Sequence, residues 1–373
     1  MRILDRAIVT RFIGNFVLLF ALLFAFATAI DVILQLDVYV AAADAVVKRG
    51  QSSGRLAALA WVLFQFHGPR AFQFFQFMAG LLAVGAMGFT FAQMHRAREL
   101  VAIMAAGVPL RRCVWAVLAC ALGINLLQLA NQELVMPLFA EQLLISQREI
   151  GREGGGTFEV PLTCDTSGNL LHATRFDPLT GRITGFLAFE RDDAGLLVRR
   201  VTAKAATWDA AGHRWALEEG SAVAREASAD PSAAAPAVPS ALDAWATDLS
   251  PKSLIARHHR LFAQMLSSSE LRSIADAGAI DHSQATRMQM GRVGLVFVNL
   301  LVLAIGIPFY LRRGPASMLQ VSIMCAATCV PALIVSAVIM AAPVAGLPPA
   351  VSVALPIAVL IPAAVGRIAW LPS

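Results

Sequence analysis

Charged residues are scarce in this sequence. Aspartate, glutamate, lysine and arginine make up 15 % of its 373 residues, whereas hydrophobic residues make up 57 %. An ordinary soluble domain is about half apolar and about a quarter charged, so the composition favours a membrane protein. The formal net charge of +5 could indicate nucleic-acid binding. The charges lie in short loops beside apolar runs, however, where basic residues set membrane topology. We therefore expect a membrane, and no nucleic acid, as partner.

Cysteine is sparse and the common catalytic motifs are absent from the sequence. Of the five cysteines only Cys164 lies in a polar region, so no disulfide framework is predicted. Cys325 and Cys329 lie four residues apart in an apolar run; they could bind a soft metal, but buried small hydrophobic side chains are the simpler interpretation. The sequence contains no G-x-x-x-x-G-K-[ST] phosphate loop, no H-E-x-x-H and no G-x-S-x-G. We expect no catalytic residue, metal or cofactor, and no ATP hydrolysis by this chain.

In place of catalytic motifs, the sequence contains apolar runs long enough to span a membrane. A helix of about 20 apolar residues crosses a bilayer, and a cleavable signal peptide has a shorter apolar region. The uncharged stretch 314–366 is too long for one helix, and its prolines divide it into two. The first predicted span covers 12–30, and the apolar run continues to Leu36. The others cover 71–93, 113–132, 293–311, 316–341 and 347–366. The sequence thus predicts six transmembrane helices, three before residue 133 and three after residue 292.

The basic residues predict the orientation of these spans. Arginines gather before the first span and between the second and third, at Arg96, Arg98, Arg111 and Arg112. Because basic loops stay on the cytoplasmic side, we expect both termini inside and the segment from about 133 to 290 outside. Asp31 falls near the outer end of the first span. An acid within a membrane is a functional candidate, although an interfacial position suits Asp31 equally well.

The segment outside the membrane changes character along its length. Short runs rich in β-branched and aromatic residues recur at 157–163, 170–176, 183–189, 196–204 and 213–217, with a further strand near 242–248. This spacing is typical of an antiparallel sandwich or roll. An alanine- and proline-rich stretch, 227–241, indicates a flexible loop whose role the sequence does not reveal. From Ser250-Pro251 the pattern turns helical, with helices expected at 254–266 and 269–277 and Ser269 as N-cap of the second.

One basic connector, HRARELVAIMAAGVPLRR (95–112), carries a single acid, Glu99. Leu100, Ile103 and Met104 recur at helical spacing, and Gly107-Val108-Pro109 ends the pattern. A short helix over about 96–107 is therefore predicted on the cytoplasmic side.

Two interpretations of that helix remain open. It could be an interfacial connector whose arginines set topology and whose apolar face lies in the headgroups, which physical chemistry alone favours. It could instead dock a cytoplasmic protein. Anionic lipid surfaces disfavour an acid, and the carboxylate of Glu99 could bind a partner arginine through both oxygens.

Several motifs resemble the lipopolysaccharide-export permeases LptF and LptG. The segment from Arg98 to Gly107 is similar to the family signature E-L-x-A-x-x-A-x-G. Glu133-Leu134-Val135-Met136-Pro137 resembles the family's exit from the third span. Ala203-x-x-Ala206-x-Trp208, followed by Trp215-x-Leu217-x-x-Gly220, resembles a run in its periplasmic β-jellyroll, and 250–292 resembles its return to the membrane. The resemblance covers nearly the whole chain.

The resemblance implies a function and a set of partners. In this family two permeases of like fold pair with a cytoplasmic ATPase dimer, and the glutamate of the short helix carries the coupling contact. That role would fall to Glu99, within a coupling segment formed by Arg98, Glu99, Leu100, Ile103, Met104 and Gly107. Lipopolysaccharide would enter from the inner membrane between the two permeases, past spans one and five. It would then pass through the apolar interior of the jellyroll to a periplasmic bridge protein, along a path for which Asp31, Phe158, Phe186 and Phe189 are candidates.

The expected layout is a helical membrane protein with an inserted periplasmic β-jellyroll. Residues 1–132 would hold three spans and the coupling helix, 133–250 the jellyroll, 251–290 a helical connector, and 291–373 the last three spans. Two alternatives are a mechanotransmitting permease of another exporter and a membrane-anchored periplasmic receptor or scaffold. The sequence distinguishes neither LptF from LptG type nor homodimer from heterodimer, and it does not identify the glycolipid.

Overall fold

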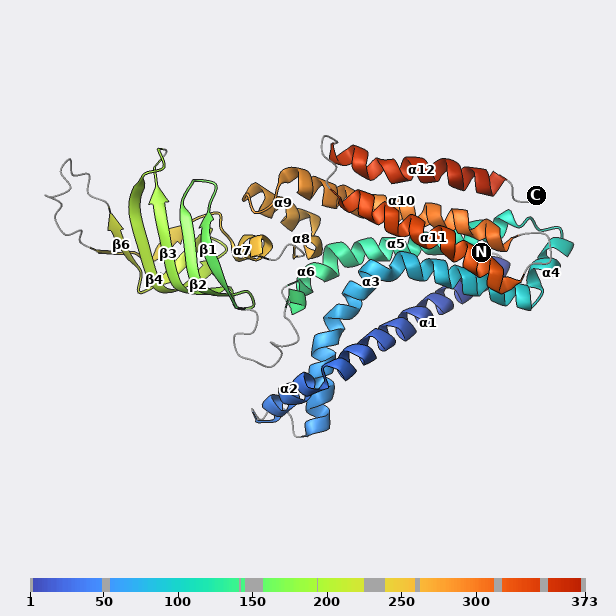
Figure 1. Ribbon diagram of the computed structural model, residues 1–373, viewed down its shortest axis with the longest axis horizontal. Helices are drawn as coiled ribbons and strands as arrows, with labels where there is room; N and C mark the ends of the chain where they lie inside the picture. Colours follow the sequence, from blue (N-terminus) through green and yellow to red (C-terminus); the bar gives the residue numbers. More distant parts are fainter. Residues whose placement is uncertain are drawn as a thin grey trace. The chain divides into compact units, whose positions relative to one another are not determined.

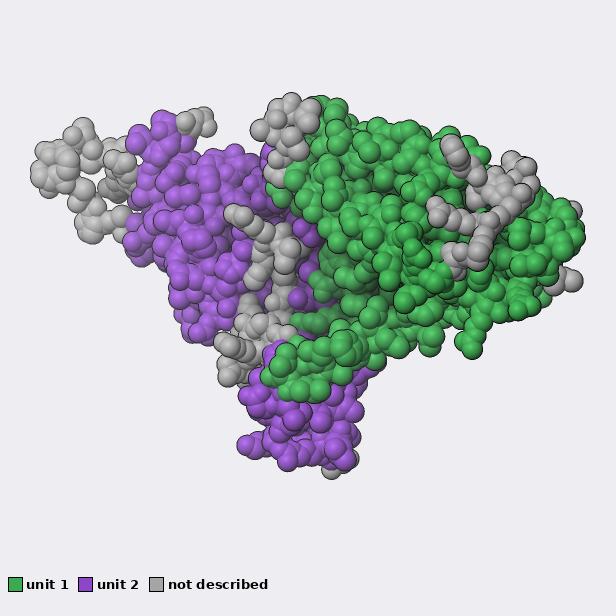
Figure 2. All heavy atoms as spheres, turned by 45° about the vertical axis from the view of Figure 1, so that its right-hand side comes forward, with its two compact units in different colours: residues 1–34, 67–136, 283–373 green, residues 35–66, 137–282 purple. Residues whose placement is uncertain are grey.

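The chain folds into two compact units, coloured separately in Figure 2. Unit 1 comprises Met1–Leu34, His67–Met136 and Ser283–Ser373, and unit 2 comprises Gln35–Phe66 and Pro137–His282. The computed structural model describes residues 3–48, 54–140, 142–144, 157–192, 194–224, 239–258, 262–311, 317–342 and 348–369.

Long apolar helices make up unit 1 (Figure 1). They are α1 (Ile3–Leu34), most of α3 (Arg55–Arg96), α5 (Arg111–Ala130), α10 (His282–Tyr310), α11 (Met318–Ala341) and α12 (Pro349–Ala369), together with the short α4 (Glu99–Ala105). A π-helical turn, η1 (Asn131–Val135), and α6 (Met136–Phe139) extend α5. Among the described residues, six helices are long and apolar enough to cross a membrane, three before and three after the β domain. The predicted six spans are confirmed.

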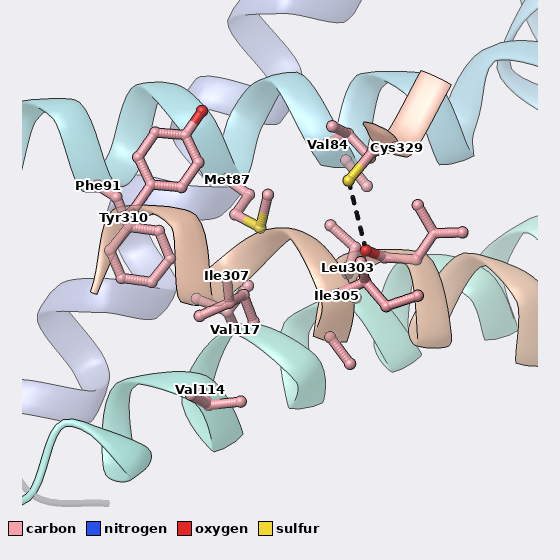
Figure 3. Packing of buried hydrophobic residues seen from close by; sticks show 14 of the residues in the cluster. Val84, Met87, Phe91, Val114, Val117, Leu303, Ile305, Ile307, Tyr310 and Cys329 are labelled. Carbon is pink, nitrogen blue, oxygen red and sulfur yellow. Dashed lines mark hydrogen bonds between the residues drawn. The ribbon is translucent and has the colours of Figure 1, made fainter. Parts of the chain in front are cut away.

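The core of unit 1 is built from the inward sides of these helices. Figure 3 shows Met87, Val117 and Ile307 meeting there from α3, α5 and α10. Phe91 stacks on Tyr310 with their ring centroids 5.9 Å apart. Cys325 and Cys329 are buried in this core, and the thiol of Cys329 donates to the carbonyl of Val302 at 3.6 Å. On the outward sides, large apolar side chains are exposed, as expected of helices that face lipid.

Amide side chains join three of the spans in the middle of unit 1. Asn299 of α10 donates to the side-chain oxygen of Asn125 on α5 at 2.7 Å. Gln128, one turn further along α5, donates to the backbone carbonyl of Gln76 on α3 at 2.6 Å. Gly80 of α3 leaves room for Asn299, because a Cβ atom there would lie 2.5 Å from the amide oxygen. Polar side chains inside a membrane bundle thus find partners on neighbouring helices, which fixes how the helices pack.

An antiparallel sheet forms most of unit 2 (Figure 1). Its strands are β1 (Phe158–Cys164), β2 (Leu170–Asp177), β3 (Arg182–Arg191), β4 (Leu197–Asp209), β5 (Arg214–Glu218), β6 (Ser221–Ala224), β7 (Ser240–Ala241) and β8 (Ala244–Ala246). The order is β1-β2-β3-β4-β5-β8, with β6 paired to β4 and to β7. Every predicted strand is present. The strands β6 and β7 were not predicted. Ser-Ala-Val-Ala carries almost no β signal, and Ser240–Ala241 falls in the stretch expected to be a loop.

The fold class predicted from the sequence is therefore confirmed. It is a helical membrane protein with an antiparallel β domain inserted between its third and fourth spans. Most of the low-complexity stretch 227–241 lies outside the described residues; its last three residues are described, and Ser240–Ala241 form β7.

Short helices complete unit 2. They are α2 (Leu36–Lys48), the first turns of α3, η2 (Gln142–Leu144), α7 (Pro251–His258), α8 (Phe262–Met265) and α9 (Ser268–Asp276). The prediction that Ser269 caps α9 is wrong. Ser267 is the N-cap, because its hydroxyl accepts from the backbone of Glu270 while the Glu270 carboxylate accepts from the backbone of Ser267. This reciprocal pair requires a Glu three residues after the cap, which Ser267 has and Ser269 lacks.

Candidate functional site: the coupling segment and the lipid path

The predicted short helix is α4, set apart from α3 by two residues, Ala97 and Arg98. Arg98 has a left-handed backbone, with φ of 53°, and this turns the chain between the end of α3 and Glu99. At the other end, Val108 N–H donates to Ile103 and Gly107 N–H donates to Met104, which is the Schellman arrangement that ends helices. Gly107 has a φ of 68°, as this motif requires. The expected stop at Gly107-Val108 is confirmed.

The two sides of α4 have different surroundings. Leu100 and Ile103 are buried in the core of unit 1, and Met104 packs against it. This apolar side is covered by the protein itself, so little of it is left for lipid headgroups. The opposite side is exposed and made of small apolar residues; the Val101 side chain is 58 % exposed, and Ala102, Ala105 and Ala106 continue this surface. We call these four residues the α4 outer face.

Glu99 lies at the edge between these two sides and is bound within the chain. The guanidinium of Arg11, on α1, donates to both carboxylate oxygens of Glu99, at 2.5 and 2.8 Å. Both side chains remain about one-third exposed, 38 % for Arg11 and 35 % for Glu99. Sequence reasoning found Glu99 but not Arg11, because 88 residues separate them and no local pattern connects them.

A second ion pair lies at the same end of α1, and here α1 supplies the acid instead of the base. Arg112, on the first turn of α5, donates to both carboxylate oxygens of Asp5 at 2.8 Å each. Bidentate pairs of arginine and carboxylate are among the stronger and more directional polar contacts in proteins. The first turns of α1 are thus tied to α4 by one pair and to α5 by the other.

At the opposite end of α1, Asp31 faces α3. Its carboxylate lies 3.6 Å from Nε2 of His67. Asp31 and Arg11 are 20 residues apart, which is about 30 Å along a helix. Asp31 and Arg11, which contacts Glu99 of the coupling segment, therefore lie in opposite halves of α1.

A π-helical turn marks the end of the third span. Within η1, Glu133 binds Arg292 of α10 at 2.8 Å, and Asn131 donates to the backbone of Phe72 on α3 at 3.1 Å. The side-chain oxygen of Asn131 is buried with no hydrogen-bond partner. Sequence reasoning singled out Glu133 to Pro137 but could not foresee the π geometry. Such π-helical turns occur mostly as single turns inside α-helices, frequently at functional sites.

Matched against protein-family models, residues 6–370 fit the lipopolysaccharide export system permease LptF/LptG. The chain belongs to the LptF/LptG family. The resemblance inferred from the coupling segment and the jellyroll motifs is confirmed, and it extends over nearly the whole chain. Among individual curated proteins, none matches the sequence.

Membership in the LptF/LptG family decides the broad function. The chain is a multi-pass membrane protein with a permease role in lipopolysaccharide export, in a system that includes other proteins. It is a transporter component, not itself an enzyme.

The β domain of this LptF/LptG chain places the three candidate phenylalanines differently. Phe186 is 2 % exposed and packs edge-on against Trp245, with ring centroids 5.6 Å apart. Phe158 stacks on His258 at 3.9 Å and also meets Phe176. Phe189 is only partly buried and pairs with Leu170 and Arg200 in the sheet. Only Phe186 of the three is fully buried, so it is the deepest of these candidate lipid contacts.

Proposed function

We propose that this chain is the permease subunit of an ABC-type transporter that extracts lipopolysaccharide from the inner membrane. It pairs with a second permease of the same family and with a cytoplasmic ATPase dimer. Both termini lie in the cytoplasm, and the β domain lies in the periplasm and hands lipopolysaccharide to a bridge protein.

The α4 outer face is the observation that carries this proposal. A helix of seven residues buries its apolar side in the core and still presents a smooth, alanine-rich surface, with Arg96 and Arg98 exposed beside it. Small side chains allow close approach of another protein, and charged residues at the rim set its orientation. The ends of α1 and α12 lie at this same end of unit 1 (Figure 1). With the arginine-rich loops inside, this end is cytoplasmic.

Glu99 and Asp31 have separate roles in the proposed transporter. The coupling segment, from Arg98 to Gly107, meets the ATPase, whereas Asp31 lies where α1 reaches the outer leaflet. The β domain then receives the acyl chains, for which the apolar side chains between its strands and helices offer a water-free environment.

Co-purification tests the proposal directly. The full chain, expressed with its ATPase and a second permease, should bring both through two affinity steps. The substitution Val101→Asp places a charge on the α4 outer face and should weaken ATPase retention at least about tenfold, which corresponds to about 1.4 kcal/mol. Leu179→Asp is the matched control, because Leu179 is an exposed apolar residue, 48 % accessible, on the β2–β3 turn.

Each contrary outcome selects a different function. If the unmodified chain retains neither protein, the transporter proposal is wrong and a membrane-anchored receptor or scaffold is favoured. If the ATPase is retained but lipopolysaccharide neither binds nor stimulates ATP hydrolysis, a mechanotransmitting permease is favoured.

A further inference from the structure

The carboxylate of Glu99 is already engaged inside the chain, and this changes the role it can have. We propose that Arg11 is a positioning residue that ties Glu99 to α1, so that movement imposed on α4 is passed to the first span. In this arrangement the α4 outer face receives the partner and Glu99 transmits its displacement. The inference rests on the proposed function and specifies how the same segment works.

The geometry of the contact favours transmission over a loose surface pair. Two hydrogen bonds join Arg11 to Glu99, so the guanidinium and carboxylate planes are fixed in orientation as well as in distance. Most exposed ion pairs contribute little, but a bidentate pair held on two packed helices is the exception. Phe12 next to Arg11 and Leu100 next to Glu99 are both buried. Local bending of either backbone therefore cannot absorb a displacement of the other helix.

The second ion pair makes this arrangement specific. Asp5 on α1 binds Arg112 on α5, with the acid and the base exchanged relative to Arg11 and Glu99. A shift of α1 by one helical turn would break both pairs. Because Asp5 and Arg11 carry opposite charges, a register that exchanged their partners would also bring like charges together. The first turns of α1 therefore have one preferred position against α4 and α5.

Beyond these pairs, α1 is attached to α3 along its length. Asn15 donates to Thr90 at 2.9 Å. Phe16 and Phe20 then pack on Phe75, with ring centroids 6.3 and 6.2 Å apart, and Asp31 meets His67 near the far end. The opposite side of α1 exposes large apolar side chains such as Leu18, Leu22 and Phe26. A displacement that enters at Glu99 thus reaches a helix whose outer side faces lipid or a neighbouring chain.

In the alternative, the carboxylate of Glu99 binds the ATPase directly. A partner arginine that bound both oxygens of Glu99 would have to displace Arg11, because both oxygens already accept from it. The two hypotheses predict different results when the charges of Arg11 and Glu99 are exchanged. Exchange within the chain preserves an internal pair but reverses the charge shown to a partner.

The test is a charge exchange in the full complex. The variants Arg11→Glu, Glu99→Arg and the double exchange are assembled with the ATPase and second permease in liposomes containing lipopolysaccharide. We expect each single variant to lose stimulation of ATP hydrolysis by lipopolysaccharide about tenfold. Arg11→Glu, which leaves the residues of the coupling segment intact, should keep basal hydrolysis and ATPase retention. The double exchange should recover stimulation to within about threefold. Arg11→Lys, which keeps the charge but not the two-point contact, should be intermediate.

A matched pair in the β domain controls for stability alone. Arg199 binds both oxygens of Glu190, at 2.9 and 2.7 Å, with similar exposure of 35 % and 24 %. Arg199→Glu should lower the unfolding temperature as Arg11→Glu does, yet keep the stimulation, because Glu190 is still present to accept from the indole N–H of Trp245.

Two results would overturn the link. One is a double exchange as defective as Glu99→Arg, which would assign Glu99 to the partner. The other is full stimulation in Arg11→Glu. Absence of the ATPase from the unmodified complex would instead overturn the proposed function, and the link with it.

Discussion

At the scale of single residues, Gly107 has the clearest conformational requirement. Its φ of 68° lies in the left-handed region, where a side chain is strained whatever the surrounding space, and no atom lies within 4 Å of an added Cβ. Gly107→Ala should therefore cost about 1 kcal/mol through backbone strain, not through collision. Urea or thermal unfolding of the purified chain in detergent measures this cost. ATPase retention should fall as well, since the end of α4 would no longer be fixed.

Gly123 supplies the control for this prediction. It lies within α5, and no atom lies within 4 Å of an added Cβ there either. Alanine is the better helix former by about 1 kcal/mol, so Gly123→Ala should leave stability unchanged or raise it. Equal losses in both variants would contradict the assignment of a special backbone to Gly107.

Single residues also differ in whether their role could be predicted from the sequence. Glu99 could be singled out because it is the one acid in a basic connector, a property visible within 20 residues. Arg11 could not, since its role depends on α1 packing beside α4. The same holds for Asn299, whose partner Asn125 lies 174 positions away. Local chemistry marks a candidate, whereas its partner is decided by tertiary packing.

At the scale of elements, the capping box of α9 connects stability to pH. Burial of the Glu270 carboxyl raises its pKa, but hydrogen bonds from Lys252 and from the Ser267 backbone lower the pKa more, so it lies below its ordinary value. A lowered pKa in the folded state stabilises the fold above the unfolded pKa of about 4.3. This stabilisation is lost as pH falls through the folded value.

We therefore expect acid to loosen this part of unit 2. Unfolding followed by tryptophan fluorescence should show a lower midpoint at about pH 3 than at pH 6, and Glu270→Gln should reduce that difference. Ser267→Ala should cost about 1 kcal/mol at pH 6, whereas Ser269→Ala should cost less. If Ser269→Ala proved the more damaging change, the cap would have been misassigned.

Elements also differ in how well the sequence predicts them. The six spans were predictable because a bilayer demands about 20 uncharged residues, a signal much longer than any local ambiguity. The strands β1 to β5 were predictable from their β-branched and aromatic residues. The left-handed turn at Arg98 and the π-helical turn at Asn131 were not, since neither needs an unusual residue. Both lie where a span meets the next segment. The turn at Arg98 directly precedes Glu99, and the turn at Asn131 contains Glu133.

At the scale of the whole molecule, the proposed function raises the question of when lipid could enter the β domain. Phe186 is buried against Trp245, and Phe176 and Trp215 are fully buried in the same domain. Burial this complete leaves no room for an acyl chain beside Phe186 without side-chain movement. Entry must therefore be coupled to a conformational step, for which ATP hydrolysis by the partner is the energy source under the proposed function.

A photo-crosslinking amino acid at Phe186 tests this coupling in the assembled transporter. Crosslinks to lipopolysaccharide should form while ATP is hydrolysed and stay near background with a non-hydrolysable analogue. The same probe at Leu179, on the exposed β2–β3 turn, should give background in both conditions. Crosslinks at Phe186 without hydrolysis would mean that the interior opens on its own. Transport without any crosslink at Phe186 would mean that the lipid passes outside the core, along more exposed residues such as Phe189.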